Sequence, residues 1–382
     1  MAKILIIEPE LSGHHRSYLE WIVVGAIQNG HSIVIGTTPC AEKILASDPI
    51  FNGLEYVLLE LPNGAMKFGG FLADVQREIA FWKWSKDIFN KSTGHTVVLL
   101  PYIDYMLNAI SLLGTPFQKI PFFGICMRAT FHHKKMGINT PHSSVSRVKE
   151  FLFKRLIRLP SLISIFSIDE SLRLYFSSYS ILNVNKIVYL ADPSDASPSE
   201  DKQISRYALG LPLDKVVILI YGAITARKGV FELLTYLELS GRDDIHVVLA
   251  GKQDENVRSY LASNSSLNSK ITQIDRRIEN AEEVELFNAC DIVWICYANH
   301  YTMSGQMIKA AQYNKYVVTK NEGLIGWICM KHDLGYVLDT MEVEDINKSI
   351  AGLSVRKINK TTSWRVDHSI SKAIHTVFNV IN

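Results

Sequence analysis

Small polar residues and glycine gather between two apolar runs near residue 304. Ser304 and Gly305 follow DIVWICY and precede KYVVTK, inside the stretch YANHYTMSGQMIKAA. Serine is a preferred N-cap residue, and glycine leaves the neighbouring backbone N–H groups uncovered. The pattern therefore predicts a helix N-terminus between two strands that can bind an anion or a sugar hydroxyl. The alternative is that the glycine only turns the chain.

Two adjacent cations follow another apolar run. Arg227 and Lys228 come after KVVILIYG, which ends in Gly222, and they directly precede Gly229 and a helical segment. Cationic side chains beside the free N–H groups of a helix start attract a diphosphate, because the two electrostatic effects add. The alternative is a solvated basic turn. The position after a strand favours phosphate binding.

A glycine and two histidines follow the first predicted strand, KILIIE. Gly13, His14, His15 and Arg16 lie in the segment ELSGHHRSYLEW. This segment lacks the GxGxxG dinucleotide fingerprint. Gly13 would let the backbone approach a ligand, and loops in this position commonly carry function. The alternative is an N-cap at Ser12 with solvated histidines behind it.

A second histidine pair follows the predicted strand IPFFGIC. Arg128, His132 and His133 lie in ICMRATFHHKKMG. A histidine there could hydrogen-bond a sugar hydroxyl or assist proton transfer near neutral pH. The pair, with two lysines behind it, could equally form a solvated loop. Adjacent histidines point in different directions on regular structure, and neither HxxxH nor DxD occurs, so no metal site is expected.

Short apolar runs alternate with longer amphipathic segments along the chain. Continuous apolarity is typical of parallel strands that helices cover on both faces. The pattern predicts an α/β protein with two doubly wound parallel-sheet domains, and the Pro-, Ser- and Asp-rich stretch 191–214 is the expected linker. The loops described above would then face a cleft between the domains. The expected strands are 3–8, 32–37, 54–61, 96–101, 120–126, 162–167, 186–190, 215–222, 245–251, 270–275, 291–297, 316–320 and 335–339.

Composition excludes several classes of function. Apolar residues make up 47% and charged residues 20% of the chain, which is typical of a well-buried globular protein. The net charge of +2 gives no support for nucleic-acid binding. The 5 cysteines form no CxxC pair, so neither a disulfide framework nor a zinc site is indicated, and a reducing cytosol fits. Neither a signal peptide nor a run of about 18 apolar residues is evident.

The segment SRVKEFLFKRLIRLP, residues 146–160, is basic and amphipathic. Its apolar residues can share one helical face, with the basic residues on the remainder. We expect a crossover helix packed on the core, with a charged outer face. The alternative is a patch that rests on an anionic membrane surface. The apolar residues are Val148, Phe151, Leu152, Leu156 and Leu159.

These motifs, taken in order, resemble those of the GT-B glycosyltransferases, specifically the retaining, nucleotide-sugar-dependent family 4. KVVILIYGAITARKGVFELLTYL resembles the first strand, phosphate loop and helix of that family's second domain. NAEEVELFNACDIVWICYANHY and SGQMIKAAQYNKYVVTKNEGLIG resemble its helix–strand segment and its donor loop, and SGHH resembles the strand-one loop that faces the acceptor. The resemblance implies two Rossmann-like domains facing across a cleft. It places an acceptor-binding domain at 1–194, a nucleotide-sugar-binding domain at 195–355 and, at 356–382, a helix crossing back to the first domain.

The resemblance also implies roles for single residues. Lys228 would pair with the donor diphosphate, and Arg227 would replace a family arginine whose position here is Ala223. The family's two glutamates correspond to Tyr301 and Lys309, so the chain is similar to a divergent subset with Ser-Gly in the donor loop. The implied donor-binding residues are Gly222, Tyr301, Arg227, Lys228, Ser304, Gly305 and Gln306; the catalytic ones are His132 (with His133 in reserve), Arg128 and His15; the acceptor-binding ones are Gly13, His14 and Arg16.

The implied function is transfer of a hexose or deoxyhexose from an NDP-sugar to a glycan or lipid-linked acceptor, with retention, in bacterial surface polysaccharide or related glycan synthesis. The leaving phosphate would take the acceptor proton, so no carboxylate pair of the hydrolase type is needed. No cofactor and no metal are expected. We expect a cytoplasmic protein, or one peripheral at the inner face of the membrane through 146–160. Because the two glutamates are missing, two alternative functions stay open. One is that of a non-catalytic relative that binds a nucleotide or a glycan, and the other, less favoured, is that of a nucleotide-sugar 2-epimerase.

Overall fold

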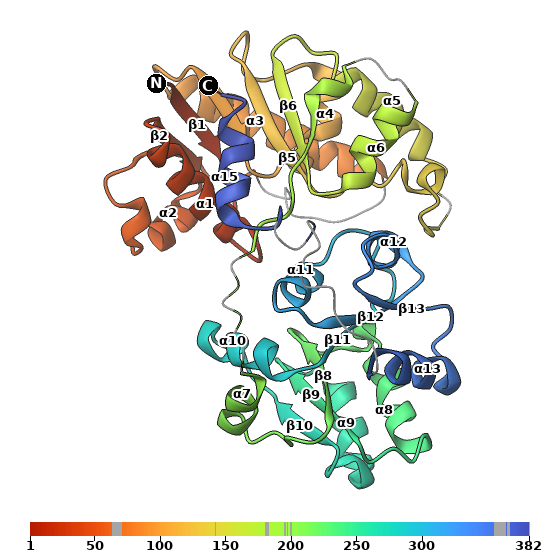
Figure 1. The fold of residues 1–382 in the computed structure, drawn as a ribbon. Helices are drawn as coiled ribbons and strands as arrows, with labels where there is room; N and C mark the ends of the chain where they lie inside the picture. Colours follow the sequence, from red (N-terminus) through yellow and green to blue (C-terminus); the bar gives the residue numbers. More distant parts are fainter. Residues whose placement is uncertain are drawn as a thin grey trace. The chain divides into compact units, whose positions relative to one another are not determined.

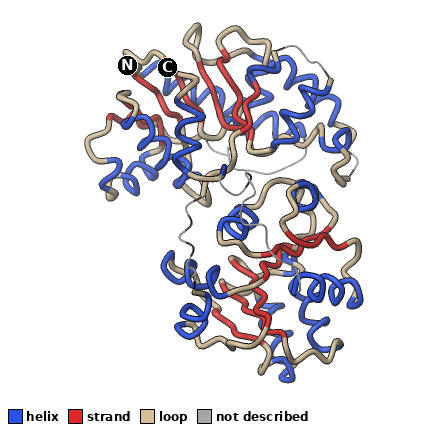
Figure 2. Tube along the Cα trace, viewed as in Figure 1, coloured by secondary structure: helices blue, strands red, loops and turns tan. Residues whose placement is uncertain are grey.

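The computed structural model describes residues 1–382 except 63–70, 142, 180–182, 195, 197, 199–200, 355–363, 365–366 and 382. The chain divides into two compact units, drawn in Figures 1 and 2. The first comprises Met1–Met136, Pro141–Ala191 and Ile370–Asn382, and the second comprises Gly137–Thr140 and Asp192–Ser369. The boundaries expected after residues 194 and 355 fall at positions outside the described residues.

The first unit is built on a 7-stranded sheet with the order β3-β2-β1-β4-β5-β6-β7, and every pairing is parallel. The direction of winding reverses between β1 and β4, which creates a topological switch point where ligands bind in such sheets. All residues of β4 and β5 are buried, as strands covered on both faces require. The strands are β1 (Lys3–Ile7), β2 (Ser32–Thr37), β3 (Glu55–Leu58), β4 (Val97–Leu100), β5 (Phe122–Cys126), β6 (Leu162–Ser167) and β7 (Ile187–Tyr189).

Helices cover both faces of this sheet (Figure 1). The C-terminal α15 packs against α1, and the contact is close because α1 carries Gly25, where a Cβ would lie 2.6 Å from Phe378. The helices are α1 (His15–Gln28), α2 (Pro39–Leu45), α3 (Phe71–Lys91), α4 (Leu107–Leu113), α5 (Ser146–Leu156), α6 (Glu170–Ser178) and α15 (Ile370–Phe378), with short 3₁₀ turns η1 (Pro49–Phe51), η2 (Ile103–Tyr105), η3 (His133–Met136) and η4 (Val184–Lys186).

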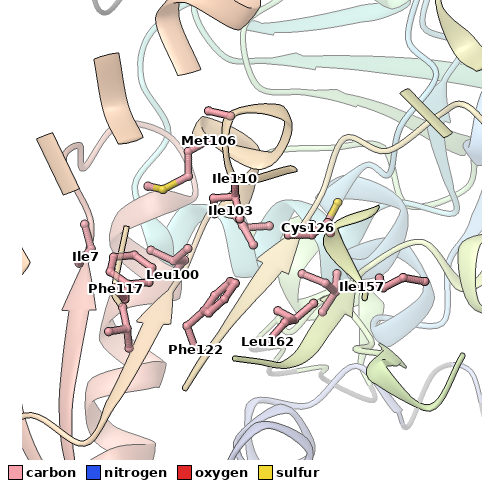
Figure 3. Packing of buried hydrophobic residues seen from close by; sticks show 14 of the residues in the cluster. Ile7, Leu100, Ile103, Met106, Ile110, Phe117, Phe122, Cys126, Ile157 and Leu162 are labelled. Carbon is pink, nitrogen blue, oxygen red and sulfur yellow. The ribbon is translucent and has the colours of Figure 1, made fainter. Parts of the chain in front are cut away.

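The core of the first unit lies between the sheet and these helices. Figure 3 shows Leu100, Ile103, Phe122 and Leu162 packing together at the junction of β4, β5 and β6. Each is at most 1% exposed. Because η2 begins inside this core at Ile103, the loop that follows β4 is anchored to the core.

The second unit is built on a 6-stranded parallel sheet with the order β10-β9-β8-β11-β12-β13. Its switch point lies between β8 and β11. The two sheets confirm the predicted α/β class with two doubly wound parallel-sheet domains. The strands are β8 (Val216–Tyr221), β9 (Ile245–Ala250), β10 (Ile271–Ile274), β11 (Ile292–Ile295), β12 (Tyr316–Lys320) and β13 (Gly335–Leu338); the helices are α7 (Lys202–Ala208), α8 (Val230–Leu239), α9 (Glu255–Ser263), α10 (Asn280–Ala289), α11 (Gly305–Gln312), α12 (Gly323–Lys331) and α13 (Val343–Ser354), with 3₁₀ turns η5 (Ala226–Lys228) and η6 (Ser265–Leu267).

The stretch 191–214 is not irregular throughout, as a linker would be. It contains α7, whose first turn is capped by the Asp201 side chain. Arg206 on α7 is 1% exposed, donates to the Ala289 carbonyl and pairs with Asp291. This guanidinium fastens α7 to the second unit. The boundary between the units, after Ala191, lies at the start of this stretch, as expected of a linker, but α7 was not predicted because the Pro and Ser content outweighed the aspartate N-cap.

Candidate functional site

The switch point of the second unit gathers several polar groups around one backbone carbonyl. Tyr221 is the last residue of β8, and its carbonyl accepts hydrogen bonds from Lys228 Nζ and, at 2.7 Å, from Gln306 Nε2. Gly222 follows with φ of +88°, and a Cβ there would lie 3.1 Å from Gln306 Nε2 and 3.2 Å from Lys228 Nζ. The glycine therefore allows the strand end to turn beneath both side chains.

The Lys228 ammonium is buried without a counter-charge. Lys228 is 5% exposed, and no carboxylate in the described part of the chain lies within ion-pair distance of it. Burial lowers the pKa of Lys228 from 10.5 to about 8, and the charge of Arg227 adds to this effect. Both cations lie over the ring of Tyr297, at 5.9 Å for Arg227 and 5.2 Å for Lys228. A buried cation in this state can bind an anion.

The N-terminus of α11 lies next to this ammonium. Ser304 is the N-cap residue but makes no side-chain capping bond, and a Cβ at Gly305 would meet nothing within 4 Å. Gln306, one residue on, joins the helix to β8 through the Tyr221 carbonyl and accepts a bond from the Tyr297 hydroxyl. The first N–H groups of α11 are thus open to a ligand, and the helix dipole favours an anion there.

The two positions where the resemblance implies glutamates hold other contacts. The Tyr301 hydroxyl donates to Asn299 Oδ1 at 3.1 Å. Lys309 pairs with Glu283, which lies in the first turn of α10 and also accepts a hydrogen bond from the Tyr221 hydroxyl. A carboxylate therefore lies about one helical turn from the start of α11, although it belongs to another helix.

The switch point of the first unit carries a carboxylate–imidazole pair. Glu8 directly follows β1 and is 0% exposed, and its Oε2 lies 3.2 Å from His15 Nδ1. Burial raises the pKa of Glu8, while the bond to His15 opposes that rise. Burial alone lowers the pKa of His15, but the hydrogen bond and charge of Glu8 outweigh it, so that this pKa is raised. With Glu8 ionised, Nδ1 is the donor and Nε2 is the basic nitrogen.

Aromatic rings fix the orientation of His15. The ring of His14 stacks on it at 4.9 Å between centroids, and the ring of Tyr105 stacks at 5.5 Å. The Tyr105 hydroxyl donates to Glu10 at 3.1 Å and lies 3.4 Å from His15 Nε2. The His15 imidazole is therefore held by stacking on its ring and by polar contacts to both of its nitrogens.

The other predicted residues of this loop and of the β5 loop take different positions. Gly13 is exposed, with φ of +60°. Arg16 pairs with Glu20 and Asp48 at 2.7 Å each, which ties α1 to η1. Arg128 is exposed after β5, and its backbone N–H donates to Asp104 Oδ1 at 3.1 Å. Unlike Arg16, Arg128 forms no ion pair with a described residue, and its guanidinium hydrogen-bonds Tyr102 and lies near the charge of Asp104.

His132 lies in the interior of the first unit, together with His133. Both are 0% exposed, and their Nε2 atoms lie 3.1 Å and 2.8 Å from the same oxygen of Asp169. The expectation that adjacent histidines point apart is wrong for this pair, because the chain turns where η3 begins. Burial by itself raises the pKa of Asp169, but the hydrogen bonds from both imidazoles outweigh it and hold this pKa well below its usual range.

These three residues are spaced as metal ligands could be. The Nδ1 atoms of His132 and His133 are buried and have no hydrogen-bond partner among the residues described. A metal on the Nε2 atoms would leave two buried N–H donors unsatisfied, whereas ligating histidines normally donate that proton. Hydrogen bonding to Asp169 accounts for the cluster better than metal coordination does.

Sequence reasoning missed four residues of these sites. Tyr221 and Glu8 stand at strand ends, so their positions could have been noticed. Tyr297 ends the apolar run DIVWICY, which predicts a strand residue, whereas β11 ends at Ile295. Glu283 carries no local signal, because only the packing of α10 beside α11 brings it to Lys309.

The second unit can bind a diphosphate and stabilise the charge of a leaving phosphate, because a cation and a helix N-terminus converge there. Residues 201–360 match the model of the family described as Glycosyl transferases group 1. No curated protein matches the chain by sequence.

Several solved structures share the fold. Sucrose-phosphate synthase from Thermosynechococcus elongatus is 12% identical, with a TM-score of 0.63 over 100% of this chain and 95% of that chain. The Anabaena protein HepE in complex with UDP and glucose is 12% identical, with a TM-score of 0.61 over 100% of this chain and 99% of that one. The lipopolysaccharide outer core galactosyltransferase WaaB is 11% identical, with a TM-score of 0.58 over 99% of each chain. The shared fold is GT-B.

Proposed function

The protein is a glycosyltransferase with a GT-B fold and a group 1 glycosyltransferase domain in its second unit, and from this premise we propose that it transfers a hexose or deoxyhexose from an NDP-sugar. The donor diphosphate binds at the β8–β11 switch point. Lys228 and the N-terminus of α11 hold it, and Arg227 lies beside them. UDP in the HepE complex, on the same fold, agrees with this donor class.

The buried Lys228 ammonium carries this proposal. A charge taken out of water without a partner destabilises the folded protein, so an anion that supplies the partner gains the energy of an ion pair that is already desolvated. Gln306 keeps the start of α11 beside the ammonium, because both side chains bond to the Tyr221 carbonyl. The Lys228 ammonium and the N-terminus of α11 therefore act on one diphosphate. Their attraction strengthens as negative charge develops on the leaving group.

Glu283 is proposed to hold the ribose of the donor. Tyr221 links the two subsites, since its carbonyl contacts the phosphate-binding side chains and its hydroxyl contacts Glu283. A carboxylate can accept about four hydrogen bonds, and Glu283 receives one from Tyr221 and one from Lys309. Its remaining lone pairs match the vicinal diol of a ribose, as acidic residues do in other nucleotide-binding α/β folds.

The acceptor is proposed to bind at the first unit, near His15 and Arg128. Glu8 orients the imidazole, so that His15 Nε2 can accept a hydrogen bond from an acceptor hydroxyl. A glycan or lipid-linked acceptor, in surface polysaccharide synthesis, fits the group that the chain resembles, and the name of WaaB points to the same class. Retention is proposed from the resemblance to the retaining group alone. Metal independence is proposed because cations of the chain itself can neutralise the leaving group.

A donor panel tests the proposal. Saturation-transfer NMR with UDP-, GDP- and dTDP-sugars should identify one bound nucleotide, and the Lys228→Met variant should lose that binding while Lys215→Met, at the opposite end of β8, keeps it. Release of NDP with glycan and lipid-linked acceptors should then persist in EDTA, and NMR of the product should show a retained anomeric configuration. Binding without turnover on any acceptor would favour the non-catalytic alternative. Equal binding by both variants would refute the assigned donor site.

A further inference from the structure

Helix α5 of the first unit, labelled in Figure 1, exposes apolar and basic side chains together. Phe151 is 62% exposed and Val148 is 46% exposed, and both lie on the same side as the exposed Arg147 and Arg155. At 3.6 residues per turn these four side chains fall within an arc of about 100°. Arg158, also exposed, follows in the turn after the helix. We call these five residues the α5 stripe.

The sequence-based expectation for this helix was wrong in part. Leu152 and Leu156 pack inward as expected, but Val148 and Phe151 face solvent. Phe153 takes an inward position instead. A helix that only covered a sheet would place its aromatic residues inward and its charges outward. The α5 stripe mixes the two kinds on one exposed surface.

The charges of the stripe are unpaired and all positive. None of its three arginines forms an ion pair with a described residue, and Glu150, the one acidic residue of α5, is buried and pairs with Lys135 and Lys154. The Lys149 ammonium lies 6.0 Å from the ring of Phe71, where α3 begins, and the next residue, Leu72, is 77% exposed. A third exposed apolar side chain, after Val148 and Phe151, therefore belongs to a segment that contacts the same basic helix.

We propose that the α5 stripe docks on an anionic lipid surface. Phe151 and Val148 would enter the boundary between headgroups and acyl chains, while the arginines contact lipid phosphates. Lipid fits better than an acidic protein or a nucleic acid, because two exposed apolar side chains stand among three arginines, and the headgroup region of an anionic bilayer accepts both kinds of side chain. Among the described residues no helix is long and apolar enough to span a bilayer, so contact through this stripe would be peripheral. The inference does not depend on the donor site.

Vesicle binding tests the proposal with the full chain. Wild-type protein should co-sediment with vesicles of phosphatidylcholine and phosphatidylglycerol and much less with phosphatidylcholine alone. Each Arg→Gln substitution at 147, 155 or 158 should lower the partition coefficient about fivefold, and all three together should lower it about a hundredfold. Phe151→Ser alone should lower the partition coefficient of the wild-type protein several-fold at any salt concentration. High salt should weaken the arginine effect, since the Debye length falls to about 3 Å at 1 M.

Matched variants separate the effect of this surface on vesicle binding from the effect of net charge. Lys43, Lys91 and Lys119 are exposed elsewhere on the first unit, so changing all three to Gln removes the same charge. Leu239→Ser removes an apolar side chain that is 70% exposed in the second unit. Neither control should change binding. Equal losses in the lysine variant, no effect of Phe151→Ser, or binding to an oligonucleotide in place of vesicles would each overturn the proposal.

Discussion

Replacement of Lys228 by Met should stabilise the free protein while it removes donor binding. The fall of the Lys228 pKa from 10.5 to about 8 reflects the cost of burying the charge. At about 1.4 kcal/mol per pH unit, this cost is about 3 kcal/mol at pH 7. Methionine has a similar shape and no charge, but it loses the bond to the Tyr221 carbonyl, worth about 1 kcal/mol. The carbonyl keeps its bond to Gln306, so the net gain should be about 2 kcal/mol.

The sign of the pH dependence follows from the lowered pKa. Below about pH 8 the folded and unfolded chains both carry the charged lysine, and the full penalty applies. Between about pH 8 and 10.5 the unfolded chain binds more protons, so wild-type stability rises with pH. The advantage of Lys228→Met should therefore be largest at pH 7 and vanish as pH approaches 10.5.

Urea unfolding at pH 7 and at pH 10 measures this difference, and calorimetric titration with the bound NDP measures affinity. Affinity should fall about a hundredfold in Lys228→Met, because a charge-assisted bond to phosphate is lost. Wild-type affinity should itself decline above about pH 8, where the free lysine loses its proton. Lys215→Met should alter neither quantity. A Lys228→Met variant that is less stable at pH 7 and binds NDP normally would refute the reasoning.

Three further substitutions probe the same units. Gly222→Ala should lower the free energy of unfolding by about 1 kcal/mol or more, because φ is +88° at this position. It should also weaken NDP binding in calorimetry, because the added methyl group crowds Gln306 and Lys228. Normal binding would show that the strand end is not part of the donor site. Glu283→Gln should lower NDP affinity about tenfold, because the carboxylate proposed to bind the ribose diol is lost. The variant should also bind UDP, GDP or ADP no more tightly than their 2′,3′-dideoxy forms. An unchanged preference for the ribose forms would show that Glu283 does not bind the ribose. Asp169→Asn should cost about 3 kcal/mol at pH 7, because two buried imidazoles lose a charged acceptor. Thermal melts of this variant should show less loss below about pH 4 than those of the wild type, because there the unfolded wild-type chain binds a proton on Asp169 that the folded chain, with its lowered pKa, does not. An unchanged melting profile would contradict the cluster's structural role.

The strands could be predicted because their signal is local. KILIIE and DIVWICY contain β1 and β11, and continuous apolarity is what burial on both faces demands. The start of α11 at Gly305 could be predicted from the local Ser-Gly pair, although Ser304 occupies the N-cap position without a side-chain capping bond. The same locality explains the error at α7, where Pro and Ser around it resembled a linker.

The contacts that define the sites could not be predicted in this way. Glu283 reaches Lys309 and Tyr221 only because α10 packs beside α11 on the same sheet. His132 looked like a loop histidine available to a ligand, yet the turn at η3 buries it against Asp169, 37 residues away. Whether a polar side chain faces a ligand or the interior depends on elements that are distant in sequence.

The sequence alone determined the fold class, the loops at the strand ends and the cationic pair at 227 and 228, because periodicity, turn residues and charge act over short distances. Tertiary structure decided that the Lys228 ammonium is buried without a carboxylate, that Glu8 faces His15, and that Phe151 stands among arginines on the solvent side of α5. Burial and counter-charge set the pKa and the affinity of a group, and both depend on which residues the fold brings around it.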